Sequence, residues 1–247
     1  MLEVNNLTVY FENALALNEL SLEVCKGEII GVLGSNSTGK TTLMNAVSGL
    51  ILDMKIKEAR RGGERIVVHG EIRFDGKEIT NLAPSKRVKR GLALCRERHP
   101  VFRDSTVLEN LRIAGNFRKN NEVKDSIEHV FEIFPHLRSF KRTTAGLLSG
   151  GEQQMLAIGM TLVTKPDLLL LDEPFLGLSP VLQSDVAKAI KDINSRGITI
   201  MVTEQFARPL LPIIDRGYVM GNGILIMGGT RQELAEDPEV RASYLGI

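Results

Sequence analysis

A glycine-containing loop that begins at Gly34 constrains this chain more than any other segment. The loop follows an apolar run at residues 28–33 and leads into a helix-like run at residues 42–50. In such a strand–loop–helix unit, glycines let consecutive backbone N–H groups approach phosphate oxygens, and the helix directs its positive end at the anion. Ser37 stands where many such loops have a third glycine, so this loop is slightly less permissive. The phosphate-binding residues that we predict are Gly34, Ser35, Asn36, Ser37, Thr38, Gly39, Lys40, Thr41 and Thr42.

Two side chains of this loop are predicted to have separate chemical roles. Lys40 is placed to reach the β- and γ-phosphates of a nucleotide, and the Thr41 hydroxyl can ligate Mg²⁺. The alternative is an ordinary strand–turn–helix connection that contains Gly-Lys-Thr by chance. Two motifs further along the chain argue against that alternative.

The first of these motifs is a run of four leucines, Leu168 to Leu171, followed by Asp172 and Glu173. A short continuous apolar run fits a strand that is buried on both faces of a parallel sheet. Acidic residues at its carboxyl end lie where α/β sheets place their ligands. We therefore expect Asp172 to hold Mg²⁺, through water, and Glu173 to be the general base for the water that attacks the γ-phosphate. Taken alone, the acidic pair fits equally well as the end of a strand and the cap of a turn before Pro174.

The second motif reads Ser149-Gly150-Gly151-Glu152 and precedes a stretch with helical apolar spacing at residues 153–163. Its glycines leave backbone N–H groups bare at a helix N-terminus, which favours anion binding. Because one chain needs only one cradle for a γ-phosphate, Ser149 and Gly151 are predicted to close on the nucleotide of another subunit. The alternative is a serine N-cap with flexible glycines and a glutamate in the first turn.

These motifs resemble those of the ATP-binding-cassette (ABC) ATPases, and the resemblance covers essentially the whole chain. Within that family the chain looks closest to the smaller ATPase subunit of branched-chain amino-acid importers. The resemblance implies an α/β fold with a P-loop NTPase core (a mostly parallel sheet with flanking helices), an antiparallel β subdomain and a helical subdomain that carries the Ser149 motif. The segments that carry it are residues 2–24, 70–80, 106–115 and 173–182, the last with Gly-Leu-Ser-Pro where most cassettes read Ala-Leu-Asp.

The resemblance also implies roles for residues outside these motifs. Phe11 falls where the family places an aromatic side chain that stacks on adenine, with Tyr10 as the neighbouring choice and an edge-strand anchor as the alternative role. Glu97 matches a loop residue, usually glutamine, that senses Mg²⁺ and the attacking water and contacts the membrane partner; the alternative is a solvated charge. Gln205 matches the switch position, where most members have a histidine that contacts the γ-phosphate. Glutamine donates a hydrogen bond but does not carry a positive charge or titrate.

These assignments define a complete set of expected site residues. Ser179 replaces the usual aspartate of the dimer-contact loop, so the cross-subunit link there must be weaker or rebuilt. The nucleotide-binding set comprises the phosphate loop, Phe11 and the four residues Ser149, Gly150, Gly151 and Glu152. The expected catalytic residues are Lys40, Glu97, Glu173 and Gln205, and the expected metal ligands are Thr41, Glu97 and Asp172.

The composition is that of a soluble globular protein, with 43% apolar and 25% charged residues among 247. That length suits one α/β domain over residues 1–247, with a helical subdomain at about 95–164 inserted in it. A net charge of +1 argues against nucleic acid as an obligatory partner. Cys25 and Cys95 have no framework spacing, the acidic start is not a signal peptide, and no apolar run approaches the roughly twenty residues that span a bilayer. We therefore expect a cytoplasmic protein that is peripheral on the inner face of the cell membrane.

Hydrophobic patterning predicts how these motifs are arranged. Three alternating stretches predict an antiparallel sheet over which adenine lies: residues 2–9, 20–25 and 66–74. Three apolar runs predict buried parallel strands: residues 28–33, 168–171 and 198–203. The remaining predictions are an exposed insert at 53–65, a charged interruption of the helical subdomain at 117–124, a strand pair at 216–227 and short helices from residue 230. No metal-ligand spacing links the four histidines, His69, His99, His129 and His136.

The leading functional hypothesis is an ATP-binding and hydrolysing subunit that energises a membrane importer, with branched-chain amino acids as the inferred cargo. Its expected ligands are ATP and Mg²⁺. Its expected partners are integral-membrane permease subunits and a second ABC ATPase, a paralogue or another copy, in a head-to-tail dimer. The alternative is a soluble ABC ATPase of an assembly system such as an iron–sulfur cluster scaffold, whose members typically keep the switch histidine that Gln205 replaces. A nucleotide-binding regulator without catalysis is a third hypothesis, and the intact Lys40, Asp172 and Glu173 argue against it.

Overall fold

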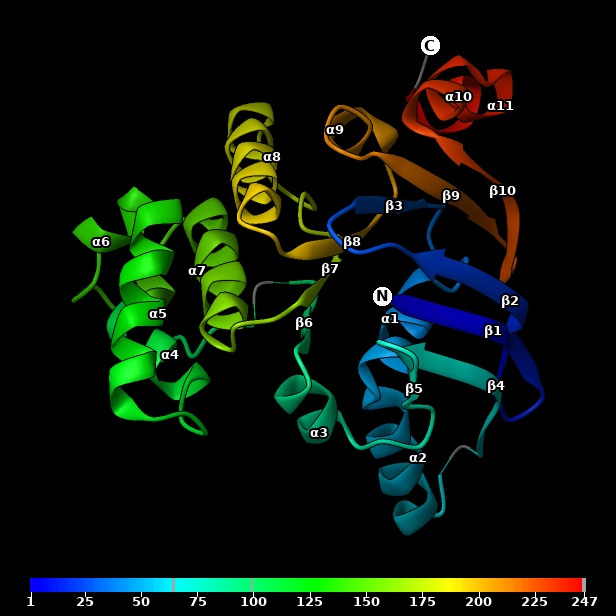
Figure 1. Ribbon diagram of the computed structural model, residues 1–247, viewed down its shortest axis with the longest axis horizontal. Coiled ribbons are helices and arrows are strands. Elements are labelled where there is room, and N and C mark those ends of the chain that lie inside the picture. The colour runs from blue at the N-terminus through cyan, green and yellow to red at the C-terminus, as the bar shows by residue number, and fades with distance from the viewer. Residues whose placement is uncertain (64, 99, 246–247) are drawn as a thin grey trace.

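Two sheets and the helices that cover them make up the fold, as Figure 1 shows for the computed structural model, which describes residues 1–63, 65–98 and 100–245. The smaller sheet is antiparallel and has the strand order β2-β1-β4-β5. The larger sheet has the order β10-β9-β3-β8-β7-β6. The predicted α/β class, with a mostly parallel core sheet and a separate antiparallel sheet, is confirmed.

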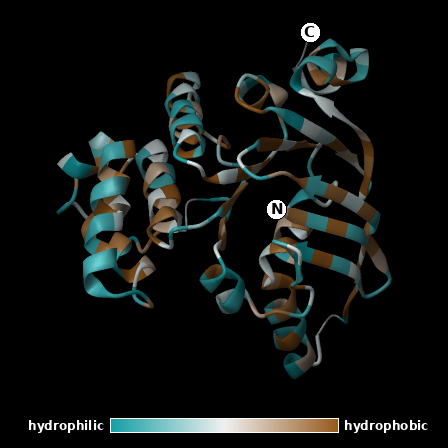
Figure 2. Cartoon of the chain, in the orientation of Figure 1, coloured by the Kyte–Doolittle hydropathy of each residue, from teal (hydrophilic) through white to brown (hydrophobic). Residues whose placement is uncertain are grey.

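The antiparallel sheet contains all three stretches that the alternating pattern predicts. Hydrophobic and hydrophilic residues alternate visibly along β1 and β4 in Figure 2. The second stretch begins earlier than expected, because its strand continues outward past the alternating part. The strands are β1 (Leu2–Phe11), β2 (Ala14–Val24), β4 (Ile66–Phe74) and the short β5 (Lys77–Glu78).

The larger sheet holds the predicted parallel strands at its centre. They are β3 (Ile29–Leu33), β7 (Leu168–Asp172) and β8 (Thr199–Glu204). The predicted strand pair is β9 (Arg216–Gly221), parallel to β3, with β10 (Ile224–Thr230) antiparallel beside it. The edge strand β6 (Leu92–Cys95) pairs in parallel with β7 and was not predicted, because four residues are too few to show a period.

The four leucines of β7 separate two hydrophobic cores. Leu169 and Leu171 pack in the core that also contains side chains of α7 (Gly150–Val163) and α8 (Pro180–Ser195). Leu168 and Leu170 pack on the other side, in the core shared by the antiparallel sheet and α1 (Lys40–Ser48). Because side chains alternate across a strand, an uninterrupted leucine run is what fills both sides.

The helical subdomain lies beside the parallel sheet, on the left of Figure 1. Its helices are α4 (Val107–Ala114), α5 (Asn120–Ile133), α6 (Pro135–Ser139), the 3₁₀ turn η1 (Ala145–Leu147) and α7. The expected charged interruption is shorter than predicted, because α5 begins inside it and buries Val123. The shorter helices outside this subdomain are α3 (Pro84–Lys89), α9 (Ala207–Leu210), α10 (Arg231–Glu236) and α11 (Pro238–Val240), followed by a final turn at Arg241–Leu245.

The predicted insert is exposed, but most of it is a helix. Helix α2 (Leu50–Arg61) follows α1 directly through Gly49, which has a left-handed φ of 85°. Only Ile51 of this helix is buried, which explains why the sequence here resembled a solvated segment. Three sequence predictions touch positions outside the described residues: Glu64 of the insert, His99 among the histidines and the last two residues of the tail.

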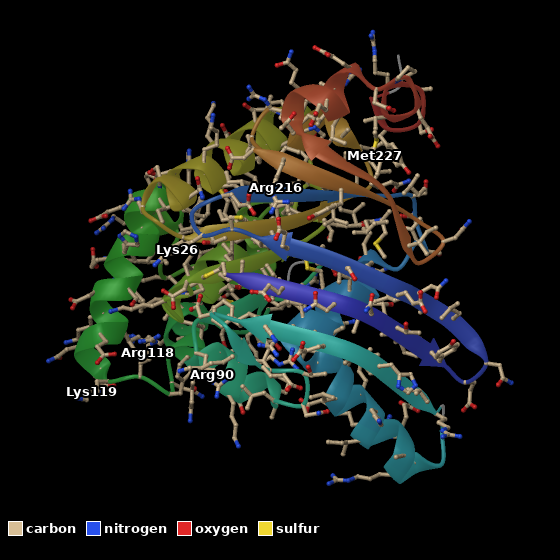
Figure 3. All side chains as sticks on the ribbon, turned by 45° about the vertical axis from the view of Figure 1, so that its right-hand side comes forward. Lys26, Arg90, Arg118, Lys119, Arg216 and Met227 are labelled. Atoms are coloured by element: carbon tan, nitrogen blue, oxygen red, sulfur yellow. The ribbon has the colours of Figure 1, made fainter. Side chains whose placement is uncertain are left out.

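Arg216 ties the two sheets together (Figure 3). It stands at the start of β9 and its Nε donates to Glu28 Oε2 at 2.8 Å. Its Nη2 donates to the carbonyl of Glu23, on β2, also at 2.8 Å. This contact fixes how the antiparallel sheet sits beside the loop that leads into β3.

Arg87 on α3 is a second buried tie, and it holds the C-terminal end of α1. The side chain is 1% exposed, and in the described part of the chain its partners are backbone carbonyls. Nη1 donates to the carbonyls of Ala46 and Val47, Nε to that of Leu82, and Nη2 to that of Thr80, all at 2.8 Å. Burial lowers the pKa of Arg87 to about 10, so it is positively charged at neutral pH. A cation at this end also offsets the negative end of the α1 dipole.

Replacing Arg87 should weaken the whole fold. Arg87→Met should lower the free energy of unfolding by about 3 kcal/mol, because several buried carbonyls lose their donors at once. The matched control is Arg90→Met, since Arg90 is exposed at the end of the same helix and should change stability by less than about 0.5 kcal/mol. Urea unfolding followed by circular dichroism measures both, and equal effects would contradict the role of Arg87.

Candidate functional site

The phosphate loop connects β3 to α1, as the sequence predicts. Ser37 adopts a left-handed φ of 65° and Gly39, at the N-terminus of the helix, a φ of 102°. The Thr38 hydroxyl donates to the carbonyl of Ser35 at 2.9 Å, and the backbone N–H of Gly34 donates to the carbonyl of Glu204 at 3.1 Å. These contacts fix the conformation of the loop where it leads into the N-terminal end of α1.

Lys40 lies inside the loop rather than on the surface, with 4% of its side chain exposed. Its Nζ donates to the carbonyls of Gly34 at 2.7 Å and Ser35 at 2.9 Å. The same atom lies 3.1 Å from Glu173 Oε1. The two residues predicted to act on the γ-phosphate are therefore in contact with each other, although they are far apart in the sequence.

Asp172 ends β7 and is buried, with 3% exposed. Its Oδ1 accepts a hydrogen bond from the Thr203 hydroxyl at 2.7 Å. Burial raises the pKa of Asp172, hydrogen bonds from Thr203 and Thr41 oppose that rise, and the negative charges of Glu173 and Glu97 add to it. A cation beside this carboxylate would favour its charged form.

The oxygen atoms of Thr41 and Asp172 suit a magnesium ion. Their hydrogen bond places a hydroxyl and a carboxylate side by side at the phosphate loop. Within the described residues no group of three or more His, Cys, Asp or Glu side chains forms a metal cage. A single hydroxyl beside a single carboxylate fits Mg²⁺, which proteins usually hold through one or two carboxylates together with phosphates and water.

Glu173 begins a tight turn after β7. Its φ of 48° is left-handed, which is uncommon for a residue with a Cβ atom. Its backbone N–H donates to the carbonyl of Thr203 at 3.1 Å. The turn directs the half-buried carboxylate toward Lys40 and away from the sheet.

A cleft of about 610 Å³ beside the phosphate loop brings several of the predicted site residues together. It is lined by eight predicted residues: Asn36, Ser37, Gly39, Lys40, Thr41, Thr42, Glu97 and Glu173. Sequence reasoning missed the other lining residues, which are Leu15, Ala16, Arg98, Leu176, Asn222 and Gly223. Asn-Gly does signal a hairpin turn, but only the fold shows that Gly223 donates its N–H to the carbonyl of Thr38 at 3.0 Å.

Ten predicted residues do not line this cleft: Phe11, Gly34, Ser35, Thr38, Ser149, Gly150, Gly151, Glu152, Asp172 and Gln205. Phe11 is half-buried and packs against the core of the antiparallel sheet, whereas the nearby Leu15 and Ala16 line the cleft. Gln205 follows β8 and is half-buried next to Glu204. Adenine stacking by Phe11 and the switch role of Gln205 both stay predictions.

The Ser149 motif lies at the N-terminus of α7, and its residues are not among those that line the cleft. The Ser149 hydroxyl accepts the N–H of Glu152, and Glu152 Oε2 accepts the N–H of Ser149 at 2.7 Å. This reciprocal cap gives the serine and the glutamate a structural role within the chain, and the cross-subunit role of the motif stays a prediction. Gly151 packs closely against α8 as well, because a Cβ atom there would stand 2.7 Å from Leu182 Cδ1, which would have to shift. Gly150 is exposed.

Gly39 allows a test of how tightly the loop is built. A Cβ atom there would lie 2.7 Å from the carbonyl oxygen of Ala16 and 2.8 Å from Leu17. Gly39→Ala should therefore lower the free energy of unfolding by about 3 kcal/mol, since strain and a backbone clash combine. The matched control is Gly62→Ala, where φ is also left-handed but the space is open, and it should cost about 1 kcal/mol. Thermal denaturation of both variants separates the clash from the strain.

Comparison with known proteins agrees with this geometry. Residues 17–176 match the family described as ABC transporter. The chain is 37% identical to the high-affinity branched-chain amino acid transport ATP-binding protein BraG of Pseudomonas aeruginosa, with 100% of both chains covered. It is 34% identical to the probable branched-chain amino acid transport ATP-binding protein LivF of Archaeoglobus fulgidus, covering 100% of this chain and 99% of that one.

Other relatives and a solved structure extend the comparison. The lipopolysaccharide export system ATP-binding protein LptB of Haemophilus influenzae is 31% identical, with 100% of this chain and 97% of that protein covered. A crystal structure of an ATP-binding cassette in its ADP conformation superposes with a TM-score of 0.83 at 28% identity, covering 100% and 99% of the two chains. The chain therefore belongs to the ABC transporter family, as one of its ATPase cassettes.

Proposed function

We propose that this ATPase energises a membrane importer for branched-chain amino acids. The observation that carries the proposal is the full-length similarity to BraG, at 37% identity. Glu97 and Gln205 support it, because both variants also resemble the amino-acid importer group. Among the described residues no helix is long and apolar enough to cross a bilayer. In this proposal the chain binds peripherally to permease subunits on the cytoplasmic face of the membrane.

The residues around the cleft support a specific division of chemical work. Lys40 binds the β- and γ-phosphates of ATP and stabilises the charge that develops during transfer. Thr41 and Asp172 would hold Mg²⁺, which supplies charge neutralisation for the phosphates. Glu173 orients the attacking water and accepts its proton. Glu97, at the edge of the cleft, reports on this water and faces the permease.

The Ser149 motif takes no part in the cleft of its own chain, which supports a dimeric enzyme. Within one chain, Ser149 and Gly151 do not line the nucleotide cleft. We infer that they bind the γ-phosphate of a second cassette, a paralogue or another copy, in a head-to-tail dimer. Ser179 caps α8 in place of an aspartate, so it contributes a neutral contact to that interface. Gln205 contacts the γ-phosphate as a neutral donor, so this step carries no histidine titration.

Similarity to LptB supports a second candidate, an ATPase of an export system. The higher identity to BraG and LivF favours the importer. A soluble assembly ATPase is not favoured, since the relatives named above are transport and export proteins.

Removing the proposed base should separate binding from hydrolysis. Glu173→Gln keeps the size of the side chain but cannot accept a proton, so kcat should fall by a factor of about 10² to 10⁴. Binding of a fluorescent ATP analogue should persist. Glu128→Gln, an exposed carboxylate on α5, is the control and should hydrolyse normally. A wild-type rate in Glu173→Gln would contradict the assignment of Glu173 as the general base.

Affinity capture from gently solubilised membranes tests the transport proposal. The tagged protein should recover two permease subunits and a second cassette ATPase. Reconstituted into vesicles, that complex should accumulate labelled leucine only when ATP is supplied, and the Lys40→Ala complex should not. Recovery of lipopolysaccharide-export components, or of soluble scaffold proteins alone, would contradict the importer.

A further inference from the structure

Glu204 is a buried carboxyl group that the chemistry proposed above does not use. It ends β8, is 3% exposed and comes directly before Gln205. Its Oε1 accepts the backbone N–H of Phe175 at 2.9 Å. Its own carbonyl accepts the N–H of Gly34 at 3.1 Å. One residue therefore contacts both the turn that carries Glu173 and the first residue of the phosphate loop.

The turn after β7 needs such support. Glu173 has a φ of 48°, a conformation that is unfavourable for a residue with a Cβ atom and persists only where its surroundings hold it. Two backbone donors anchor the turn to the end of β8. The N–H of Glu173 donates to the carbonyl of Thr203 at 3.1 Å, and the N–H of Phe175 donates to Glu204. The N–H of Glu173 also lies 3.3 Å from the Thr203 hydroxyl, so the first anchor has a backbone acceptor besides a side chain, whereas the acceptor of the Phe175 N–H is the Glu204 side chain.

The charged groups that face Glu204 are Glu173, from the turn, and Lys40, from α1. Burial raises the pKa of Glu204 to about 8 and the charge of Glu173 adds to the rise, while N–H bonds from Phe175 and Gln205 and the charge of Lys40 oppose it. At neutral pH the carboxyl is therefore mostly protonated. It can hold the Phe175 N–H without placing a second negative charge beside Glu173.

We propose that Glu204 is a positioning residue for ATP hydrolysis. Its carboxyl group fixes the turn at residues 173–175, so that the Glu173 carboxylate stays at the cleft beside Lys40. Glu204 acts through the turn and does not touch the nucleotide. The inference rests on the proposed role of Glu173 as the general base.

Two substitutions separate the hydrogen bond from the bulk of the side chain. Glu204→Leu keeps a buried side chain but lacks the acceptor, and its kcat should fall about tenfold or more, while the KM for ATP changes by less than about threefold. Glu204→Gln keeps an acceptor oxygen and should restore most of kcat near neutral pH. Thr199→Val, at the other end of β8, removes a hydrogen bond from the N–H of Gly27 and is the control. It should leave kcat within about twofold of wild type.

The pH profile provides a readout that a merely structural role would not move. In the wild-type protein, kcat should fall as the pH rises through about 8, because ionised Glu204 then repels the Glu173 carboxylate. Glu204→Gln should lack this fall. The folded pKa lies above the ordinary value of 4.5, so between 4.5 and about 8 the unfolded chain binds fewer protons than the folded one. The stability of wild type relative to Glu204→Gln should therefore decrease across that interval as pH rises.

Defined results would overturn the inference. A wild-type kcat in Glu204→Leu does so, as does a loss that falls equally on kcat and on ATP affinity. If Glu204→Leu does not fold, the Glu204→Gln profile decides, and a profile identical to wild type counts against the proposal. Glu173→Gln is assayed alongside. If that variant hydrolyses ATP normally, the general-base assignment fails. If it is inactive while Glu204→Leu is unaffected, only the role of Glu204 fails.

Discussion

The hydrogen-bonded register of three parallel strands determines where every group of the site lies. β3 pairs with β8 so that Leu33 stands opposite Glu204, and β7 pairs with β8 so that Asp172 stands opposite Thr203. The three carboxyl ends therefore stop at one level, where the phosphate loop and the acidic pair meet. A shift of one residue would turn each side chain to the opposite face. The two hydrophobic cores on either side of β7 prevent that shift.

The site also depends on an imbalance of charge. Lys40 is buried in the cleft and pairs with Glu173. Its charge also acts on Glu204, and the charges of Glu173 and Glu97 act on Asp172. Burial raises the pKa of Asp172 and of Glu204, the negative charge of Glu173 adds to the rise, and their charged forms are disfavoured. The proposed Mg²⁺ at Thr41 and Asp172 would offset this excess, so metal binding and ionisation of Asp172 should favour each other.

Sequence reasoning predicted the parts whose backbone pattern carries the chemistry. The phosphate loop, the strand before Asp172 and the antiparallel sheet all follow from local period and glycine placement. It did not predict that Leu15, Ala16 and Gly223 line the cleft, because their place depends on how the hairpin after β9 and the start of β2 pack against the loop. Nor did it single out Glu204, whose significance comes from burial and from one hydrogen bond to a residue in a different part of the chain.

Arg87 gives this arrangement an anchor that does not respond to acid. Its acceptors are the carbonyls of Ala46, Val47, Thr80 and Leu82, which have no proton to gain or lose. A carboxylate partner in their place would be protonated as the pH fell, and the ion pair that held the C-terminal end of α1 would be lost. Because a guanidinium group binds carbonyl oxygens here, the C-terminal end of α1 stays fixed as the pH falls. Protonation of Asp172 and Glu204 then affects the N-terminal end of α1, beside the phosphate loop, and leaves the contacts of Arg87 unchanged.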